Sequence, residues 1–548
     1  MTTPEMTAEM APVTQDPQEW LLTQRERGNP ATRLDDRHEG EVAWSTGNSV
    51  RPLVHGTAYF TELLAAVRGL WAGDLLMFTD WRGDPDELLA DGVEVSEVLC
   101  HAARRGVIVK GLVWRSHLDR LQFSEAENRH LGEEIEAAGG ECLLDMRVRP
   151  GGSHHQKFIV LRHIGRPELD VAYVGGIDLC RSRHDDAAHK GDPQAQPMAK
   201  VYGSRPPWHD AQVEIRGPAV GDVEAVFRER WEDPAPLTRN PAHRLRALLQ
   251  REDTRPDPLP PQPPDPPHCG PHTVQLLRTY PRRWHGYSFA PDGERSIARS
   301  YHKVLNRARG LIYLEDQYLW SPQVAAPFAE ALAANPELHM IAVIPRFPDQ
   351  DGRLSLPPNL LGHGLALDML RRGGGDRVAV YGLENHEGTP VYVHAKVCVV
   401  DDAWACVGSD NFNLRSWTHD SELSCAVLDE TPDPREPRFP GEPGRPARVY
   451  ARDLRLGLNR EHLDRPGTDE ADTDLCDPRS LFKAFAASAA ALDAWHDAGR
   501  HGPRPPGRLR AYRQPDLSRW TKAWATPLYR GVFDPDGRPR ALRRAGAF

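Results

Sequence analysis

The sequence lacks the segments that would insert a protein into a membrane or direct it across one. Its first residues show no basic start followed by an apolar core of signal-peptide length, and no run approaches the roughly 20 apolar residues of a transmembrane helix. The eight cysteines include no CxxC pair. Cys398, Cys406 and Cys425 lie instead in apolar runs, where a free thiol behaves as a small hydrophobic group. We therefore expect a reduced, cytoplasmic protein, while export by a signal-independent route and peripheral contact with a membrane stay open.

Excess positive charge is missing as well. The formal net charge is -10, which argues against a protein whose whole surface follows nucleic acid, so nucleic acid is not an expected partner. A length of 548 residues is too great for one ordinary hydrophobic core, so we expect two or more domains. The 50 prolines and 45 glycines indicate long connecting loops between them.

Strand-like and helix-like stretches alternate on both sides of a proline-rich segment. This segment, Arg255 to Pro271 (RPDPLPPQPPDPPHCGP), can form neither a helix nor a central strand and predicts a semi-rigid linker. The expected strands span residues 75–81, 107–114, 158–162, 171–174, 311–315, 338–344, 378–381 and 391–400, and the expected helices span 220–231, 297–309 and 362–372. Alternation of this kind predicts an α/β fold with one layered unit on each side of the linker.

The composition divides the chain into five expected regions. They are an N-terminal tail (1–45), a first lobe (46–240), the proline-rich linker (241–275), a second lobe (276–465) and a C-terminal extension (466–548). From Arg500 onward the extension carries twelve arginines or lysines and three aspartates, interleaved with aromatic residues such as Trp520 and Trp524. This composition fits two interpretations: a solvated extension packed across the surface, or an interfacial segment whose arginines attract anionic lipid headgroups.

One motif occurs once in each lobe. HHQKFIVLRHIGRPELDVAYVGGIDL begins at His154, and VHAKVCVVDDAWACVGSDNFNLRS begins at Val393. Each contains a histidine, any residue, a lysine, an apolar strand, a turn and a second apolar strand, followed by a Gly-Gly or Gly-Ser pair and a polar side chain two residues later. The matching positions are His155 with His394, Lys157 with Lys396, Gly176 with Ser409, and Asp178 with Asn411.

The spacing of histidine and lysine in each triplet has a mechanical meaning. Side chains two residues apart on a strand point to the same face, so each triplet sets an imidazole beside an ammonium group. A duplicated fold with a pseudo-twofold axis would bring both triplets into one pocket. Such a pocket suits a phosphodiester, because the lysines stabilise the charge that develops on its oxygens, one imidazole attacks phosphorus and the other protonates the leaving alcohol. Since the lysines supply the positive charge, we expect neither a metal nor another cofactor.

Together, HHQK with GGIDL and HAK with GSDNFNLRS resemble the two HKD motifs of the phospholipase D superfamily, and especially those of its phosphatidylcholine-hydrolysing branch. The resemblance covers the chain from roughly Val50 to Leu463 and includes the segments WHD, from Trp208, and EDQY, from Glu315. It implies two similar α/β lobes around one shared active site. It also implies a phospholipid substrate at a membrane surface and a phosphohistidine intermediate on the first-lobe histidine, His155.

Members of the family also place a carboxylate beside each histidine, outside the triplet. There it fixes the tautomer of the imidazole and stabilises the imidazolium. By this resemblance Asp210 serves the first-lobe histidine, and Glu422, with Asp420 as second choice, serves the second. The rim of the phosphate site is expected to include Ser409, Asn411 and Asp178.

The first motif departs from the family pattern. Arg162 stands five residues after Lys157, where the pattern has an aspartate, whereas the second motif keeps Asp401. The resemblance puts Asp401 in the catalytic set, but its strand parity is opposite to that of Lys396, which indicates a bracing role. We expect that Arg162 changes the local bracing, with Asp170 in a similar role, and leaves the chemistry intact.

The leading hypothesis is a phospholipase D that hydrolyses phosphatidylcholine-type lipids to phosphatidate and a free alcohol, with transphosphatidylation when another alcohol competes. One alternative keeps the chemistry and changes the substrate, as in a cardiolipin synthase-like phosphatidyltransferase or a nuclease of the same superfamily. The other is an inactive membrane-binding module in which Arg162 marks decay. The missing membrane spans and the net acidity argue against the first alternative, and the two intact triplets argue against the second.

Overall fold

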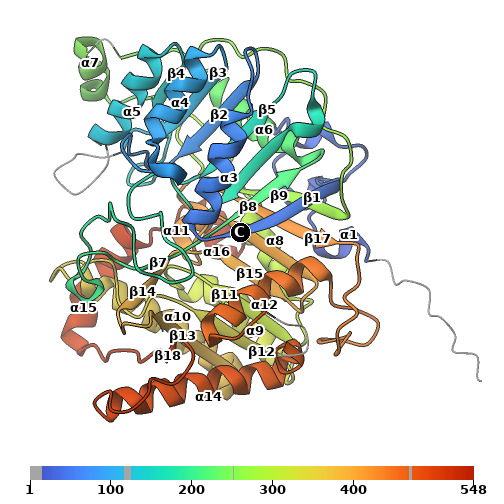
Figure 1. Ribbon diagram of the computed structural model, residues 1–548, viewed down its shortest axis with the longest axis vertical. Coiled ribbons are helices and arrows are strands. Elements are labelled where there is room, and N and C mark those ends of the chain that lie inside the picture. Colours follow the sequence, from blue (N-terminus) through green and yellow to red (C-terminus); the bar gives the residue numbers. More distant parts are fainter. Residues whose placement is uncertain (1–14, 117–124, 251, 468–471) are drawn as a thin grey trace, which may run out of the picture.

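The computed structural model describes residues 15–116, 125–250, 252–467 and 472–548 (Figure 1). Its strands form two sheets that meet at β1 (Ser45–Val54), which pairs with β8 (Ala211–Arg216) on one side and with β9 (His272–Tyr280) on the other. In Figure 1 the blue and green first half of the chain fills the upper part of the view, and the yellow to red second half fills the lower part. The chain thus folds as two layered halves joined along one seam.

Both sheets have the same order of strands. The first contains, in spatial order, β4 (Glu141–Asp145), β3 (Ile108–Trp114), β2 (Leu75–Asp80), β5 (Phe158–Arg162), β6 (Val171–Gly175), β8 and β1. The second contains β13 (Val378–Glu384), β12 (His339–Val343), β11 (Leu311–Glu315), β15 (Val397–Val400), β16 (Trp404–Gly408), β17 (Glu422–Asp429) and β9. In each, the first three strands are parallel and the other pairs are antiparallel. The predicted pair of similar α/β lobes is therefore confirmed.

Helices also follow equivalent strands in the two lobes. In the first lobe the helices after β1, β2, β3 and β8 are α3 (Gly56–Arg68), α4 (Val95–Arg104), α5 (Glu125–Ala137) and α6 (Ala219–Trp231). In the second the helices after β9, β11, β12 and β17 are α8 (Ser296–Leu305), α9 (Pro322–Ala334), α10 (Leu356–Gly374) and α12 (Val449–Leu463). Parallel neighbours need a crossover connection, so α4, α5, α9 and α10 are the helices that make the parallel strands of each lobe feasible.

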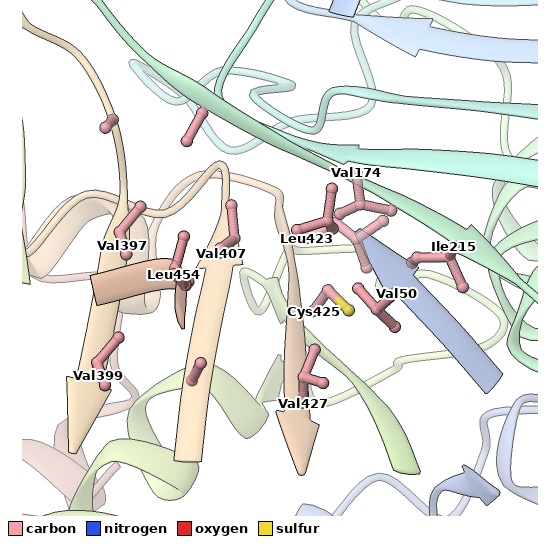
Figure 2. Packing of buried hydrophobic residues seen from close by; sticks show 14 of the residues in the cluster. Val50, Val174, Ile215, Val397, Val399, Val407, Leu423, Cys425, Val427 and Leu454 are labelled. Atoms are coloured by element: carbon pink, nitrogen blue, oxygen red, sulfur yellow. The ribbon is translucent and has the colours of Figure 1, made fainter. Parts of the chain in front are cut away.

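The hydrophobic core extends across the seam between the sheets. Val50 on β1, Val174 on β6 and Ile215 on β8 gather around Leu423 and Cys425 on β17 (Figure 2). All five side chains are buried, because alternate residues of each strand face the opposite lobe. Burial of this apolar surface holds the two lobes in contact.

Shorter elements complete the two lobes and their connections. They are α1 (Pro17–Trp20), α2 (Gln24–Arg27), β7 (Trp208–His209), α7 (Pro241–Gln250), β10 (Glu294–Arg295), β14 (Pro390–Val393), α11 (Leu414–Thr418) and α13 (Thr473–Cys476). Residues 252–271 form neither helix nor strand, as their proline content predicts.

The strand predicted over residues 391–400 is interrupted. β14 ends before His394 and β15 begins after Lys396. The N–H groups of His394 and Ala395 both donate to the carbonyl oxygen of His209, at 2.7 and 3.1 Å, because β14 pairs in parallel with β7 of the first lobe. The prediction of one continuous strand is wrong here, since the triplet leaves its own sheet to contact the other lobe.

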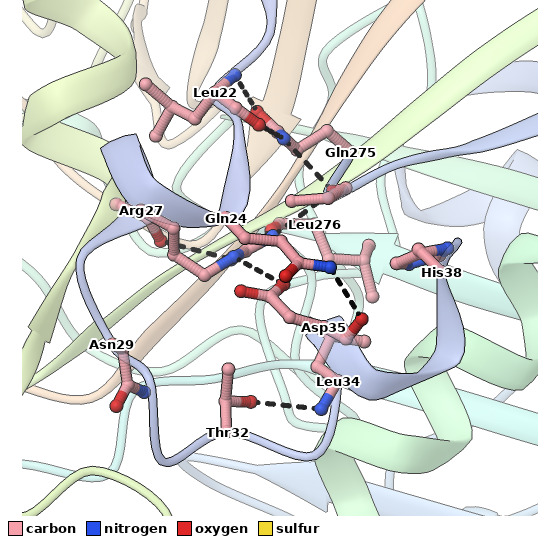
Figure 3. A network of polar contacts seen from close by, with 12 residues as sticks. Leu22, Gln24, Arg27, Asn29, Thr32, Leu34, Asp35, His38, Gln275 and Leu276 are labelled. Carbon is pink, nitrogen blue, oxygen red and sulfur yellow. Dashed lines mark hydrogen bonds and ion pairs between the residues drawn. The ribbon is translucent and has the colours of Figure 1, made fainter. Parts of the chain in front are cut away.

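The N-terminal segment packs against the second lobe, as Figure 3 shows around Arg27 and Gln275. The side-chain amide of Gln275 on β9 accepts from the N–H of Leu22 at 2.9 Å and donates to its carbonyl at 2.7 Å. Arg27 is buried and forms an ion pair with Glu294 at 3.0 Å. The described part of the segment expected as an N-terminal tail thus lies against the body, because a buried arginine holds it there. Residues 1–14 lie outside the described residues.

The C-terminal extension packs across the second lobe. Its elements are α14 (Pro478–Asp497), β18 (Leu509–Ala511), α15 (Arg519–Leu528) and α16 (Arg540–Ala545). β18 pairs with β13, and Ala525 and Tyr529 join a buried cluster with Trp320 and Leu361. Trp520, in contrast, is 79% exposed. Among the described helices, none combines the length and apolar character needed to cross a bilayer.

Candidate active site

The two triplets occupy equivalent positions in the two lobes. His155 to Lys157 directly precedes β5, and His394 to Lys396 directly precedes β15. In each, the lysine ammonium turns back to its own histidine: Lys157 Nζ donates to the carbonyl oxygen of His155 at 2.9 Å, and Lys396 Nζ makes the same contact with His394. The predicted placing of one imidazole beside one ammonium is thus present in both lobes, although each triplet lies just before a strand instead of within it.

Main-chain hydrogen bonds join each triplet to the opposite lobe. The N–H of His155 donates to the carbonyl of Ser421 at 2.9 Å, and the N–H of Ser421 donates to the carbonyl of Ser153 at 3.0 Å. The bonds from His394 and Ala395 to His209 form the equivalent contact on the other side. Each triplet is therefore aligned with the residue that precedes an acidic side chain of the other lobe.

Because of this alignment, each histidine pairs with a carboxylate from the other lobe. Glu422 Oε2 lies 2.9 Å from Nδ1 of His155, and Asp210 Oδ2 lies 2.6 Å from Nδ1 of His394. The expectation that Asp210 serves His155 and that Glu422 serves His394 is therefore wrong. The physical reason is register, because parallel contacts between Ser421 and His154 and between Val393 and His209 place each acid beside the histidine of the other lobe.

Asp420 holds the chain beside this pair instead of serving as the partner of a histidine. Its Oδ1 accepts from the N–H of Ser153 at 2.8 Å, and its Oδ2 accepts from Nε of Arg415 at 2.6 Å. The bond to Ser153 fixes the segment that leads into His155. Asp420 thus acts on the main chain, and Glu422 is the carboxylate that contacts the imidazole.

The three expected rim residues have different surroundings. Ser409 Oγ donates to Glu422 Oε2 at 2.6 Å and accepts from the N–H of Leu423 at 3.0 Å, so it positions the acid. Asn411 is buried and its side-chain oxygen has no hydrogen-bond partner among the described residues. Asp178 Oδ1 lies 3.5 Å from Lys157 Nζ and therefore neutralises a lysine.

Three further side chains belong to the site and carried no clear signal in the triplets. Gln317 Oε1 accepts from Lys396 Nζ at 3.3 Å. The ring of Trp208 lies 4.9 Å from that of His394, and the guanidinium of Arg183 lies 4.1 Å from the ring of Trp208. Trp208 and Gln317 lie in the segments WHD and EDQY, whose resemblance names segments and not roles, and Arg183 follows the segment GGIDL by four residues.

Asp401 is not part of this constellation. It stands beyond the far end of β15 from Lys396, and its carboxylate accepts from the N–H groups of Arg309, Gly310 and Leu311 at 2.8, 2.8 and 2.9 Å. The catalytic assignment of Asp401 is therefore wrong, and the bracing role that its parity indicates is confirmed. Three main-chain donors on one buried carboxylate fix the start of β11.

Arg162 braces the equivalent end of β5. Its Nε donates to Asp170 Oδ2 at 2.7 Å, and its other nitrogens contact Glu224 on α6 and the carbonyl oxygen of Pro264 in the linker. Asp74, just before β2, accepts from the N–H of Ile164 at 2.8 Å. In both lobes a carboxylate thus links the hairpin to the neighbouring strand. In the second lobe this carboxylate, Asp401, belongs to the hairpin, whereas in the first lobe it is Asp74, just before the neighbouring strand β2.

The two histidine-bound carboxylates differ in their affinity for protons. Burial, reinforced by the nearby charge of Asp420, raises the pKa of Glu422 to about 8. Burial acts on Asp210 too, but His394, Lys396 and Arg183 outweigh it and bring the pKa of Asp210 below its usual range. Near neutral pH, Asp210 is therefore ionised while Glu422 is close to its titration point.

The imidazoles and lysines influence one another across the lobes. Burial lowers the pKa of His155 well below its usual value, and Lys157 and Lys396 add to the effect. Burial and Lys396 lower the pKa of His394 as well, against the opposing charge of Asp210. Burial lowers the pKa of Lys396 itself to about 8, and Lys157 contributes. Two neutral imidazoles and two ammonium groups therefore share one electrostatic environment.

The arrangement can hold and cleave an anionic ester. Each Nδ1 faces a carboxylate, which leaves each Nε2 to act on a bound group. The side chains of His155 and His394 remain 15% and 5% exposed, so both retain contact with solvent. Among the described residues, side chains with metal-ligand geometry gather around Glu461 and Glu315 and not around the triplets.

Comparisons with known proteins point to one family. A sequence model described as Phospholipase D matches residues 139–326, which include the first triplet and Asp210. Phospholipase D alpha 1 of Oryza sativa subsp. japonica is 23% identical over 449 residues, which cover 61% of this chain and 54% of that protein. Phospholipase D1 of Homo sapiens is 28% identical over 377 residues, which cover 60% of this chain and 34% of that protein. The chain thus aligns with about half of the plant relative, and with a smaller share of the human one.

A solved structure with partial similarity is the phosphatidylserine synthase of Haemophilus influenzae. It aligns with 70% of this chain and 82% of its own length, with a TM-score of 0.44 and 12% sequence identity.

Proposed function

We propose that this chain, which belongs to the phospholipase D superfamily, hydrolyses the headgroup ester of phosphatidylcholine-type phospholipids to phosphatidate and a free alcohol. The observation that carries the proposal is the crossed pair of histidines, each held at Nδ1 by a carboxylate of the opposite lobe at 2.9 and 2.6 Å. A lysine accompanies each histidine, so that two cations can flank one phosphate.

In the first step Nε2 of His155 attacks phosphorus. A P–N bond forms, the P–O bond to the headgroup breaks, and the departing oxygen takes a proton from Nε2 of His394. The anionic phosphate and the ionised Asp210 both favour the imidazolium form of His394 that supplies this proton. The products are the headgroup alcohol and a phosphatidyl group on His155.

In the second step the histidines exchange roles as acid and base. Nε2 of His394 takes a proton from water, whose oxygen attacks phosphorus, and the P–N bond to His155 breaks. Phosphatidate leaves, His155 is again neutral, and His394 again carries the proton that the next leaving group needs. When another alcohol replaces water, the same step forms a new phosphatidyl ester, which is the transphosphatidylation that this chemistry permits.

Lys157 and Lys396 stabilise the charge that grows on the phosphoryl oxygens in both steps. Their ammonium groups are held by the carbonyl oxygens of His155 and His394, so they are oriented before substrate arrives. Such preorganisation removes the need to reorient charges during the reaction.

The test uses phosphatidylcholine vesicles with ethanol. We expect choline, phosphatidate and phosphatidylethanol from the purified chain, and loss of all three on His155→Asn. Cleavage of a plasmid without phosphatidylethanol would assign a nuclease, and transfer of a phosphatidyl group to phosphatidylglycerol alone would assign a phosphatidyltransferase. Vesicle binding without any product would indicate an inactive module.

Peripheral contact with an anionic membrane surface forms the second part of the proposal. A hollow of about 1610 Å³ is bordered by Pro150 and His419, which precede His155 and Glu422 by five and three residues. Its lining includes Arg149, Arg239, Arg282, Arg283, Arg530, Arg538, Arg540 and Arg543, together with Trp284, which is 94% exposed. Arginines beside an exposed tryptophan suit the headgroup region of a bilayer.

Vesicle sedimentation tests this contact. We expect Arg540→Glu with Arg543→Glu to weaken binding to vesicles that contain phosphatidylglycerol, and added salt to weaken binding of the unmodified chain. The control is Arg68→Glu with Arg104→Glu, two exposed arginines of the first lobe outside the hollow. Equal loss in both variants would show that net charge, and not this surface, controls binding.

A further inference from the structure

Three histidines converge on one glutamate beside the active site. They are His55 after β1, His189 in the loop before β7, and His209 on β7, and the glutamate is Glu461 on α12. His55 Nε2 lies 2.7 Å from Glu461 Oε2, while His189 Nε2 and His209 Nδ1 lie 2.9 and 3.4 Å from Glu461 Oε1. The three histidines are buried and the glutamate side chain is 12% exposed. Four separate segments of the chain thus meet at one carboxylate.

The partners of His189 fix which of its nitrogens carries hydrogen. Nδ1 lies 2.9 Å from the carbonyl oxygen of Trp208, which can only accept. The N–H of the neutral ring is therefore at Nδ1, and Nε2 presents a lone pair. That lone pair faces Glu461 Oε1, which as a carboxylate is also only an acceptor.

His209 has the same arrangement with its nitrogens exchanged. Nε2 lies 2.6 Å from Glu315 Oε2, and Glu315 Oε1 accepts further bonds from Tyr313 at 2.6 Å and His462 at 2.8 Å. A carboxylate surrounded by three donors places the hydrogen of His209 at Nε2. Nδ1 has no hydrogen-bond partner among the described residues and lies 3.4 Å from the same oxygen of Glu461.

Two ring nitrogens and one carboxylate oxygen therefore face one another, and one cation placed between them would contact all three. The rings of His189 and His209 have their centroids 5.6 Å apart. One divalent ion satisfies all the acceptors at once, and His55 Nε2 supplies a further nitrogen.

The four side chains lie close enough together for one ion to contact them all. The ligand atoms of His55, His189, His209 and Glu461 all lie within 4.8 Å of one another. A zinc ion with ligand distances of about 2.0–2.1 Å separates its ligand atoms by roughly 3.3 Å. The imidazole planes are inclined to one another at 85°, 70° and 54°.

The other nitrogens of two of these rings have the partners that metal-bound histidines require. A ligating histidine usually donates its free N–H to a carboxylate or a main-chain carbonyl, which fixes the tautomer and the ring orientation. Glu315 fills this role for His209, and the carbonyl of Trp208 fills it for His189. The outer contacts are thus in place without any change in the fold.

We propose that His55, His189, His209 and Glu461 bind one divalent transition-metal ion, with Zn²⁺ as the favoured occupant because three imidazoles and one carboxylate are typical zinc donors. The site is separate from the triplets, and the proposal does not depend on the proposed function. The ion would join the end of β1, the loop before β7, β7 and α12.

The site has a direct path to the active site. His209 is adjacent to Asp210, and its carbonyl oxygen receives the N–H groups of His394 and Ala395. An ion on Nδ1 of His209 would therefore fix the segment that holds both members of the pair Asp210 and His394. Its role is positioning, because none of its four ligands contacts the nucleophile, His155.

The experiment uses the full chain purified without a polyhistidine tag. We expect close to one zinc per chain by elemental analysis. Dialysis against a chelator should lower Tm, and equimolar ZnCl₂ should restore it. Co²⁺ added to the metal-free chain should give the visible absorption bands of a four-coordinate site with nitrogen donors.

Ligand variants locate the ion. His55→Gln with His189→Gln should lose the cobalt bands and the Tm shift, and Glu461→Gln should weaken zinc binding at least tenfold. The control is His496→Gln, which removes a histidine 2.9 Å from Glu384 outside the cluster and should keep both signals. Wild-type chain that holds no stoichiometric metal and shows no Tm shift with ZnCl₂ would overturn the proposal, and so would unchanged cobalt bands in the double variant. If the double variant does not fold, the single variant His55→Gln and the wild-type stoichiometry decide.

Discussion

The two triplets stand at equivalent points of two sheets with the same strand order, yet the acids that hold their histidines have opposite tendencies. Glu422, beside His155, lies near the charge of Asp420, and its pKa rises to about 8. Asp210, beside His394, lies near Lys396 and Arg183, and its pKa falls. A duplicated scaffold has therefore placed matching imidazoles in unlike electrostatic surroundings. In the proposed mechanism, this difference lets one histidine attack while the other carries the proton.

The side chains five residues after each lysine, which brace the strands, also have unlike partners in the two lobes. Asp401 accepts from three main-chain N–H groups, whereas Arg162 reaches Asp170, Glu224 and the linker. Neither side chain contacts a triplet histidine. The departure of the first motif from the family pattern thus falls on the part of the motif that fixes the strand, away from the histidine and the lysine.

The largest effect should come from the histidines. We expect His155→Asn and His394→Asn each to lower kcat on phosphatidylcholine by about 10³-fold or more. A phosphatidyl ester of p-nitrophenol separates their roles, because this leaving group departs without a proton. His394→Asn should release one equivalent of p-nitrophenol in a burst and then stall with the lipid on His155, while His155→Asn should give no burst. The reverse result would exchange the two roles.

Replacement of the two acids by amides should have the next largest effect. It tests whether each acid serves the histidine of the other lobe. We expect Asp210→Asn and Glu422→Gln to lower kcat by about 10²- to 10⁴-fold, because each amide no longer fixes the tautomer of its histidine. With the p-nitrophenol ester, Asp210→Asn should resemble His394→Asn and keep its burst. Glu422→Gln should resemble His155→Asn. If Asp210→Asn lost its burst instead, the pairing would follow the lobes and not cross between them.

The pH dependence should reflect the unlike environments. Attack by His155 requires Glu422 to be ionised, so activity rises as pH increases through about 8. Lys396 must keep its proton, and since burial lowers its pKa to about 8, activity falls as pH increases beyond that value. We expect a narrow bell in kcat/KM centred near pH 8. Lys396→Arg should keep the acid limb and move the alkaline limb upward, and an unchanged alkaline limb would remove Lys396 from the profile.

The smallest effect on turnover should come from the two braces. Arg162→Leu removes the buried cation shared by Asp170 and Glu224, of which Glu224 keeps Arg228 at 2.6 Å, and should lower the free energy of unfolding by about 3–5 kcal/mol. Asp401→Asn removes a charge from three main-chain bonds and should cost about 1–3 kcal/mol. Denaturant unfolding measures both, and kcat per folded molecule should be unchanged. A large loss of kcat in a folded Asp401→Asn protein would return this residue to the catalytic set.

Local patterns predicted the elements well and the contacts between lobes poorly. The strand predicted over 311–315 has those bounds, and the helix predicted over 220–231 begins one residue earlier. Both are set by the spacing of apolar residues within one segment. The triplets were visible for the same reason, since residue type and spacing recur at two places in one chain.

The crossing of the acids could not be read from the sequence, because it depends on register between segments far apart in the chain. Glu422 is 267 residues from His155, and Asp210 is 184 residues from His394. The residues next to each acid in the sequence do not indicate which lobe's histidine the acid will contact. The interruption of the strand at His394 has the same origin, and so does the burial of Arg27 against Glu294, which is 267 residues away.

The crossed carboxylates also constrain how such a molecule could have arisen. A single lobe would hold a histidine without its carboxylate, and its own carboxylate would face a partner lobe that is absent. Two identical copies docked face to face would complete each other, and gene fusion would then free each copy to specialise. The unequal acids of the present chain fit the outcome of that specialisation.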